Sequence, residues 1–275
     1  KTAFRSGIKV TRATDCKIDG NVCLNNADVG IILSPTSGLG CLRSQVNNNI
    51  CTNQGNGIII DNSCSAITVD GNVCCLNTLD GIDVNDITDY ILSNNICDEN
   101  GEKGILSWGS RRGVITGNHC KNNNQVGSDP KDSGIEIRWH PETFTESDRL
   151  LITSNICTDN QAVKTQASGI RIQSNSQKIR VIGNDLENNL TQGLLLEGTA
   201  TDNLMKDNYG TIVDNSSGSN HVEYIEDNGG ALTISAGTVT ASHSYHTIDT
   251  EAGAASDDLT TINGANRIGQ PLVVA

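Results

Sequence analysis

Three features of the sequence predict an all-β fold built from stacked coils. A Gly followed by Ile or Leu recurs every 23 to 35 residues, at Gly7, Gly30, Gly57, Gly81, Gly104, Gly134, Gly169 and Gly193. An Asn with Cys two positions later recurs in step with these glycines, and no segment has helical periodicity. One unit of about 23 residues cannot bury its apolar face alone, so the units are expected to stack. The architecture that fits best is a right-handed parallel β-helix of about eight coils.

The segment after each repeated Gly is expected to be a strand. Residues one and three positions after the Gly are apolar in nearly every coil, as in Ile58 and Ile60, and they should face the core. Residues two and four positions after the Gly should then face outward. These strands would form one continuous sheet along the stack.

The repeated Asn is expected to lie at a tight turn, because Asn and Gly tolerate left-handed backbone geometry. Stacked Asn side chains can hydrogen-bond up and down the stack. The predicted ladder consists of Asn21, Asn49, Asn72, Asn95, Asn118, Asn155 and Asn184.

Six of the ten cysteines form a column two positions after the ladder: Cys23, Cys51, Cys74, Cys97, Cys120 and Cys157. In the last coil Leu186 takes the same place, which suits an apolar filler and not a metal ligand. The column is therefore interpreted as reduced core cysteines. Distance alone would also permit a disulfide between stacked cysteines, and Cys41 and Cys64 look like a second short stack.

The formal net charge of −13 disfavours a nucleic-acid duplex or an anionic membrane surface as the main partner. No apolar run has the length of a transmembrane helix, so membrane insertion is not expected. The repeat fades after about residue 205. We predict a β-helix over 1–222 and a β-rich segment over 223–275, which is either a cap or the start of a trimerisation domain cut short at Ala275.

The Gly-Ile and Gly-Asn-x-Cys repeats over about residues 5–215 resemble the pectate-lyase-like superfamily of right-handed β-helices. That superfamily includes polysaccharide lyases, glycoside hydrolases, C5-epimerases, carbohydrate-binding proteins and phage tailspikes. The tail "SYHTIDTEAGAASDDLTTING" and "GQPLVV" resembles the β-rich region after the β-helix in phage tail proteins. This resemblance implies a homotrimer on a virion tail or outside the cell, which folds in a reducing cytoplasm.

The resemblance assigns no catalytic residue. The Tyr-Gly-x-Asp-Pro-His motif of alginate-type epimerases, the Asp pattern of polygalacturonases and the nonapeptide calcium repeat are all absent. No cofactor is predicted, and calcium is not indicated by a motif.

Candidate site residues come from the outward positions of the middle coils. These positions hold Asp61, Asp83, Asn85, Trp108, Glu136, Arg138 and Arg171, and Trp139 and His140 follow directly. Extra residues around 124–133 and 140–149 are expected to form loops that wall a groove. Trp108 and Trp139 could serve as platforms for sugar rings.

Glycoside hydrolysis needs two carboxyl groups, and an inverting mechanism places them about 6.5–9.5 Å apart. Strand spacing puts Asp83 about 9.5 Å from Glu136 and about 8 Å from Asp61. The hypothesis is that Glu136 is the acid and Asp83 the water-activating base, with Arg138, Arg171, Asn85 and His140 binding the glycan. Two alternatives stay open. The charges could be ordinary solvated groups held by Arg–carboxylate pairs, or Arg138 or His140 beside Glu136 could serve a uronate lyase or epimerase.

The function predicted from the sequence is a tailspike-like depolymerase that binds and cleaves a bacterial surface polysaccharide. A non-catalytic adhesin or structural tail protein, and a uronate lyase or C5-epimerase, are the alternatives.

Overall fold

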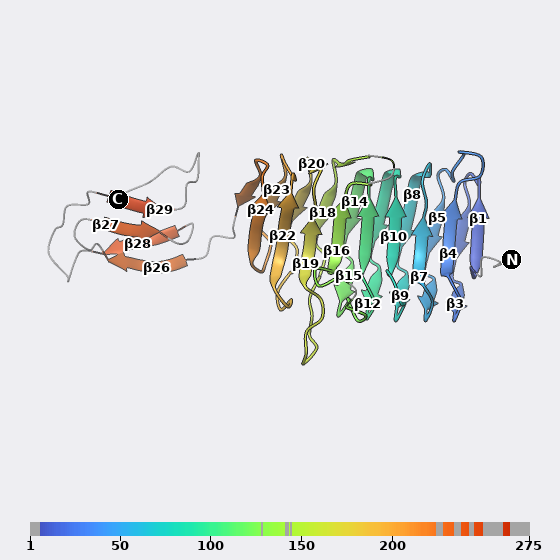
Figure 1. Cartoon of the computed structure of the whole chain (residues 1–275), viewed down its shortest axis with the longest axis horizontal. Helices are drawn as coiled ribbons and strands as arrows, with labels where there is room; N and C mark the ends of the chain where they lie inside the picture. Colours follow the sequence, from blue (N-terminus) through green and yellow to red (C-terminus); the bar gives the residue numbers. More distant parts are fainter. Residues whose placement is uncertain are drawn as a thin grey trace. The chain divides into compact units, whose positions relative to one another are not determined.

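The structure is a computed structural model that describes residues 6–127, 129–140, 143 and 145–223, together with four later strands. The chain divides into two compact units, Lys1–Glu223 and Tyr224–Ala275. The first unit is a right-handed parallel β-helix, as predicted, and its coils follow one another along the stack (Figure 1). Among the described residues no helix is long and apolar enough to span a membrane.

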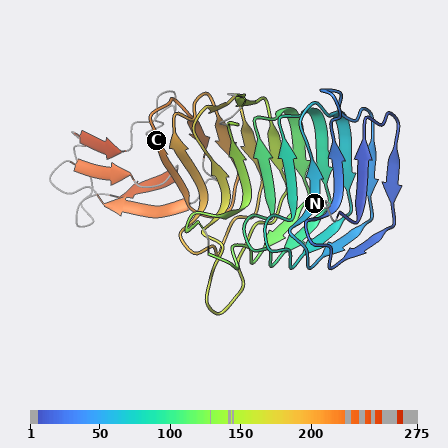
Figure 2. The ribbon, with the colours of Figure 1, turned by 45° about the vertical axis from the view of Figure 1, so that its right-hand side comes forward.

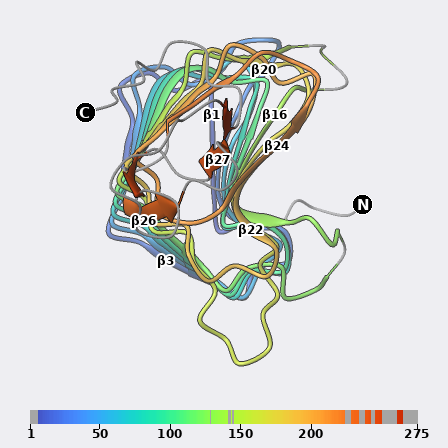
Figure 3. The ribbon, with the colours of Figure 1, turned by 90° about the vertical axis from the view of Figure 1, so that its left-hand side faces the viewer.

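Three parallel sheets surround the core of the β-helix, and Figure 3 shows the coils end on. Sheet A carries the strands that follow each repeated Gly: β1 (Ile8–Thr11), β4 (Val29–Ser34), β7 (Asn56–Ile60), β10 (Ile82–Asn85), β13 (Ile105–Trp108), β16 (Ser133–Arg138), β19 (Ser168–Ile172), β22 (Gln192–Gly198) and β24 (Ile212–Ser216). Figure 2 shows these strands side by side along the stack.

Two further sheets complete each coil. Sheet B contains β2 (Lys17–Asp19), β5 (Gln45–Asn47), β8 (Ser65–Asp70), β11 (Thr88–Ser93), β14 (Arg111–Thr116), β18 (Leu151–Thr153), β21 (Arg180–Ile182), β23 (Leu204–Lys206) and β25 (His221–Glu223), with β17 (Ser147–Asp148) and β20 (Ser176–Gln177) beside this path. Sheet C contains β3 (Val22–Leu24), β6 (Ile50–Thr52), β9 (Val73–Cys75), β12 (Ile96–Asp98) and β15 (His119–Lys121).

The predicted alternation along sheet A is confirmed. Ile58 and Ile60 are fully buried, and the register pairs Ile58 with Ile82 and Ile60 with Val84. One inward position breaks the pattern, because Ser107 lies where other coils place an aliphatic residue. Its hydroxyl is 2.9 Å from that of the fully buried Tyr90, so a large side chain from sheet B compensates for a small one from sheet A.

The predicted Asn ladder is also present. The Nδ2 of Asn72 donates to Oδ1 of Asn95 at 2.9 Å, and the Nδ2 of Asn95 donates to Oδ1 of Asn118 at 2.9 Å. The ladder continues beyond Asn184, which donates to Asn208. Each amide after Asn21 also donates to a backbone carbonyl of the previous coil, so the turn has few unsatisfied groups.

A second amide ladder, not expected from the sequence, lies five positions after the first, except that Gln166 comes eleven positions after Asn155. The members that hydrogen-bond in succession are Asn77, Asn100, Asn123, Gln166 and Asn189. Asn26 and Gln54 form a further pair of the same kind.

All ten cysteines are free, and the six of the predicted column are buried together with Leu186. The register pairs Cys23 with Cys51, Cys51 with Cys74, and Cys97 with Cys120. The interpretation as reduced core residues is therefore confirmed. The second short stack is present as well, since Sγ of Cys64 accepts from the Cys41 amide at 3.2 Å.

Sheet B has one residue per coil that the strand pairing skips and that adopts a left-handed backbone. We call this set the bulge column, and it consists of Asp15, Arg43, Ala66, Asp89, Arg112, Arg149, Lys178 and Asp202, with φ between 46° and 57°. A bulge turns its side chain away from the regular alternation. Seven of the eight residues are charged, so the column places a row of charges on the outside of the β-helix.

The second unit contains β26 (Asn228–Thr233), β27 (Thr238–Ala241), β28 (Tyr245–Asp249) and β29 (Thr261–Gly264). Strand β26 pairs with β28, and β27 pairs with β29, both in parallel. Much of the tail that resembles phage tail proteins lies outside the described residues. A role for this unit as a cap or trimerisation domain stays a prediction.

Candidate functional site

The outer face of sheet A carries two rows of side chains set by the strand register. The first outer row contains Ile32, Ile59, Asp83, Leu106, Glu136, Arg171 and Leu195. The second outer row lies two residues further along each strand and contains Asp61, Asn85, Trp108, Arg138, Gln173 and Glu197. Every candidate residue of sheet A that the sequence predicted falls on one of these rows.

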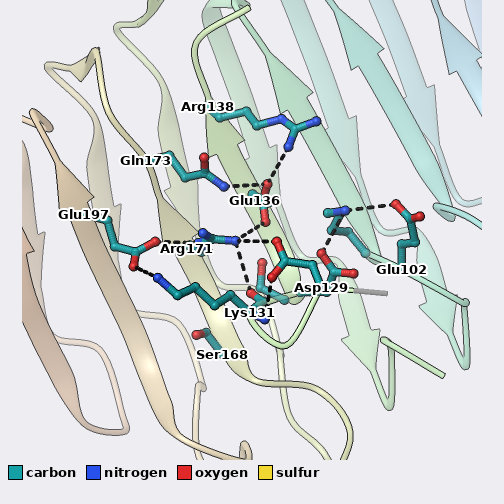
Figure 4. A network of polar contacts seen from close by, with 12 residues as sticks. Glu102, Asp129, Lys131, Glu136, Arg138, Ser168, Arg171, Gln173 and Glu197 are labelled. Carbon is teal, nitrogen blue, oxygen red and sulfur yellow. Dashed lines mark hydrogen bonds and ion pairs between the residues drawn. The ribbon is translucent and has the colours of Figure 1, made fainter. Parts of the chain in front are cut away.

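The alternative of ordinary solvated charges on an open sheet is wrong for the first outer row. The side chain of Glu136 is 0% exposed and that of Arg171 is 8% exposed, although both point away from the core. Their burial follows from side chains of the second row and from the loop that precedes β16, which contributes Asp129 and Lys131 (Figure 4). The other part of that alternative, Arg–carboxylate pairing, is present.

Glu136 is the centre of this network. Its Oε1 accepts from Nε2 of Gln173 at 2.8 Å and from Nη1 of Arg138 at 3.4 Å. Its Oε2 accepts from Nη1 of Arg171 at 3.3 Å. Burial raises the pKa of Glu136, and the charges of Arg171, Lys103 and Arg138 oppose that rise. The carboxyl is thus satisfied by protein groups on both oxygens.

Arg171 connects Glu136 to the loop before β16. Its Nε donates to Oε2 of Glu197 at 2.8 Å, and its Nη1 lies 3.4 Å from Oδ2 of Asp129. Lys131 from the same loop pairs with Glu197 at 2.5 Å. These contacts fix the loop over the end of the first outer row.

A stack of three side chains lies on the second outer row. The guanidinium carbon of Arg138 is 3.6 Å from the centre of the Trp108 ring, a cation–π contact. The ring of His140 meets Trp108 edge on, with centroids 5.2 Å apart. Nδ1 of His140 accepts from the Thr143 amide at 3.2 Å. Trp139 is half-buried and directly follows β16.

Asp83 is half-buried on β10, between Ile59 and Leu106 of the same row. Its Oδ2 accepts from Nδ2 of Asn85 at 3.2 Å. Burial raises the pKa of Asp83 to about 6. The Asn85 hydrogen bond and the charge of Arg138 oppose the rise, while the nearby charge of Asp61 adds to it.

A buried acid–base pair lies behind Asp83. Asp80 accepts from the backbone amide of Lys103 at 2.9 Å, and the Lys103 ammonium is 2.8 Å from Asp132. Burial and the charge of Asp83 raise the pKa of Asp80. Burial acts to lower the pKa of Lys103, but the surrounding carboxylates, Asp80 foremost, outweigh it and raise that pKa. Neither residue was predicted from the sequence. Each lies directly before a repeated Gly, whereas the candidate residues lie two and four positions after it.

Three polar atoms on neighbouring strands lack a hydrogen-bond partner among the described residues although they are buried. They are Oδ1 of Asp83 on β10, Nε1 of Trp108 on β13 and Nε of Arg138 on β16. Buried polar atoms are nearly always paired, so three together mark a place where a ligand or water would complete the set. One acceptor and two donors match the hydroxyl groups of a sugar.

The loops agree only in part with expectation. The segments around 124–133 and 140–149 are insertions, as predicted from the repeat spacing. A third insertion lies between Cys157 and Gly169, and its turn is held by Asp159, whose Oδ2 accepts from the amides of Thr165 and Gln166. The sequence contained the signal for it, because eleven residues lie between Cys157 and Gly169, whereas six lie between Cys97 and Gly104.

No group of three or more His, Cys, Asp or Glu side chains in the described part of the chain is arranged to hold a metal ion.

Comparison with known families places the chain. Residues 37–210 match the family model described as right handed beta helix region, which covers more than half of the chain. The protein therefore belongs to the right-handed β-helix family. Comparison with curated proteins gave no match.

Solved structures are similar to this chain at low sequence identity. The A-module of a mannuronan C-5 epimerase from Azotobacter vinelandii superposes with a TM-score of 0.52 at 13% identity, over 95% of this chain and 55% of the epimerase module. Tailspike protein 2 of an Escherichia coli O157:H7 bacteriophage gives 0.49 at 14% identity, over 84% of this chain and 34% of the tailspike. An alginate lyase from Paenibacillus gives 0.48 at 14% identity, over 78% of this chain and 99% of the lyase. The chain thus spans about half of the epimerase module and a third of the tailspike.

Proposed function

We propose that the protein binds a polysaccharide across the outer rows of sheet A and hydrolyses its glycosidic bonds. The observation that carries this proposal is the set of three buried, unpartnered polar atoms on Asp83, Trp108 and Arg138. They lie on three adjacent strands, and one of them belongs to the Asp83 carboxyl, whose pKa burial raises to about 6. A sugar bound there would satisfy the unpaired atoms and meet an acid that is still protonated under mildly acidic conditions.

Asp83 is the better acid of the candidate carboxyl groups. A general acid must hold a proton at the working pH, and the burial of Asp83 has that effect. Asp61 is the proposed base, since it directly follows Ile60, which pairs with Val84 one coil away; this puts it diagonal to Asp83, at about 8 Å between backbones from the strand geometry. That separation leaves room for the water of an inverting mechanism.

Glu136, proposed from the sequence as the acid, is better suited to a positioning role. It has no exposed surface, and protein groups occupy both of its oxygens. Its charge holds Arg138, which in turn stacks on Trp108. Arg138 and Trp108 would then contact the glycan, and Glu136 would act through them.

The lyase or epimerase alternative has less support from the geometry. It requires a base beside the reacting sugar, and His140 is engaged with the Trp108 ring and the Thr143 amide. A bacterial surface polysaccharide as ligand, a homotrimer as assembly, and a virion tail or extracellular location complete the proposal. Each of these follows from the resemblance to tailspikes.

The test uses the full chain with a panel of bacterial capsular and O-antigen polysaccharides. Release of reducing ends is expected with one member of the panel, without the absorbance of an unsaturated uronate. Asp83→Asn and Asp61→Asn should each abolish release while glycan binding persists. Glu99→Gln, an exposed acid at the turn that follows β12 of sheet C, is the matched control and should leave the rate unchanged.

Cleavage that survives in both Asp83→Asn and Asp61→Asn would refute the assigned pair. Binding without any reducing-end release would support the adhesin alternative, and an unsaturated product would support a lyase.

A further inference from the structure

A groove of about 630 Å³ lies on the outer face of sheet B, on a different sheet from the candidate site. Four basic side chains and one acidic side chain line it: Arg112, Arg149, Lys178, Arg180 and Asp202. The chain as a whole carries a net charge of −13, so this concentration of positive charge is local and runs against the overall balance.

The bulge column sets the spacing of these charges. Arg111 pairs with Asp148, and Asp148 pairs with Gln177, so the next residues Arg112, Arg149 and Lys178 occupy equivalent places in successive coils. Neighbouring coils are about 4.8 Å apart. The bulge column therefore contributes one cation from each of three successive coils, and Arg180 adds a second cation in the coil of Lys178.

Packing inside the β-helix explains the small residue in the floor of the groove. Gly113 carries no side chain, and a Cβ at that position would lie 2.2 Å from a ring carbon of the buried Tyr90. Val114, Leu151 and Leu204 continue the floor and are half-buried. The result is a hollow with an apolar floor and a basic rim, which is the arrangement that sugar rings with charged substituents require.

Two of the four cations are available for a ligand. Arg112 binds Asp89 through Nε and Nη2, at 2.7 and 2.8 Å, and Arg149 pairs with Asp148. Lys178 and Arg180 are exposed, and neither forms an ion pair with any residue that the structure describes. An exposed cation without a partner can bind an anion without first breaking a protein contact.

We propose that this groove is a second binding site, for a linear acidic polysaccharide with about one carboxylate or other negative charge per sugar. A carboxylate of one sugar would meet Lys178 and Arg180, which lie in the same coil, and the neighbouring sugars would lie beside Arg149 and Arg112 of the adjacent coils. Duplex nucleic acid carries one charge per about 1.7 Å, which is far denser than this row. The groove also lacks the aromatic side chains on which single-stranded bases stack. The site does not depend on Asp83 or on catalysis.

The experiment measures binding of the full chain to sodium polygalacturonate at low salt, with neutral dextran as the comparison polymer. Polygalacturonate should bind and dextran should not. The double variant Lys178→Gln/Arg180→Gln should bind at least about tenfold more weakly, because two charge-assisted contacts are lost. Lys178→Arg/Arg180→Lys, which keeps both charges, should bind as the natural chain does.

Arg12→Gln/Arg43→Gln is the matched control. It removes two exposed charges, both at residues with the same left-handed backbone as Lys178 and both outside the groove, and should change affinity less than about twofold. Equal losses in the two double variants would show a general charge effect and overturn the proposal. Absence of polygalacturonate binding would overturn it too. The proposal would also be overturned if oligothymidylate bound as tightly as polygalacturonate and if Lys178→Gln/Arg180→Gln weakened that binding.

Discussion

At the scale of single residues, the burial of Asp83 has two measurable consequences. Its pKa in the folded chain is raised from 3.8 to about 6, so the folded state binds this proton more tightly than the unfolded state. Stability from this group is therefore present at low pH and is lost as the pH rises through about 6. If Asp83 is the acid, the rate of hydrolysis is lost over the same range.

We expect Asp83→Asn to raise the free energy of unfolding at about pH 8 by roughly 1–3 kcal/mol, because the variant carries no buried charge. At about pH 4 the two chains should differ little, since Asp83 is then mostly protonated. Denaturant unfolding at the two pH values gives the comparison. A variant that is less stable than the natural chain at about pH 8 would contradict the assigned shift.

A second measurement at this scale is the pH profile of kcat/KM. We expect a fall in activity above about pH 6, set by loss of the Asp83 proton. A profile that stays flat up to about pH 8 would exclude Asp83 as the acid.

At the scale of elements, the amide ladder should make the turns of the β-helix sensitive to single truncations. Asn95 accepts from the backbone and side chain of Asn72 and donates to Val69 and Asn118. Asn95→Ala leaves these buried groups unpaired, and we expect a loss of about 3 kcal/mol or more in the free energy of unfolding.

Asn21→Ala is the control for that variant, because Asn21 begins the ladder and is only half-buried. Its loss should be clearly smaller when both are measured by denaturant unfolding. Equal losses would mean that each amide stabilises only its own turn, and that the stacking of amides between coils contributes little.

The repeated elements were predictable from the sequence, because a fixed period brings equal residues to equal places. The strands of sheet A and the first amide ladder follow from the recurrence of Gly and Asn alone. The second ladder was not predicted, because Gln54 and Gln166 replace Asn in two coils, although glutamine supplies the same amide. The coils share the hydrogen-bonding capacity of an amide at that position, and not the identity of the residue.

For the candidate site, the sequence predicted only which residues lie on the outer face of sheet A. The period places Asp83, Trp108 and Arg138 on one side of sheet A, but it does not say how deeply each is buried. Burial of Glu136 depends on a loop that carries Asp129 and Lys131, and a loop without a repeat has no register to predict it. The roles of Glu136 and Asp83 could therefore be separated only by the contacts.

At the scale of the whole molecule, a homotrimer is the assembly that the resemblance to tailspikes predicts. Sheet C offers apolar surface for such an assembly, since Val22, Ile50 and Ile96 are exposed in one row across its strands. Light scattering of the full chain should give three times the mass of one chain. A monomer at high concentration would count against this assembly.

The column of buried cysteines provides a reporter of where the β-helix opens. Burial raises the pKa of Cys74, Cys97 and Cys120 well above that of a free thiol, so little reactive thiolate exists while the coils are closed. Each of six consecutive coils holds one buried thiol of this column. A thiol reagent with mass-spectrometric readout would therefore record which coils separate first, and in what order, as the stack unravels from its ends.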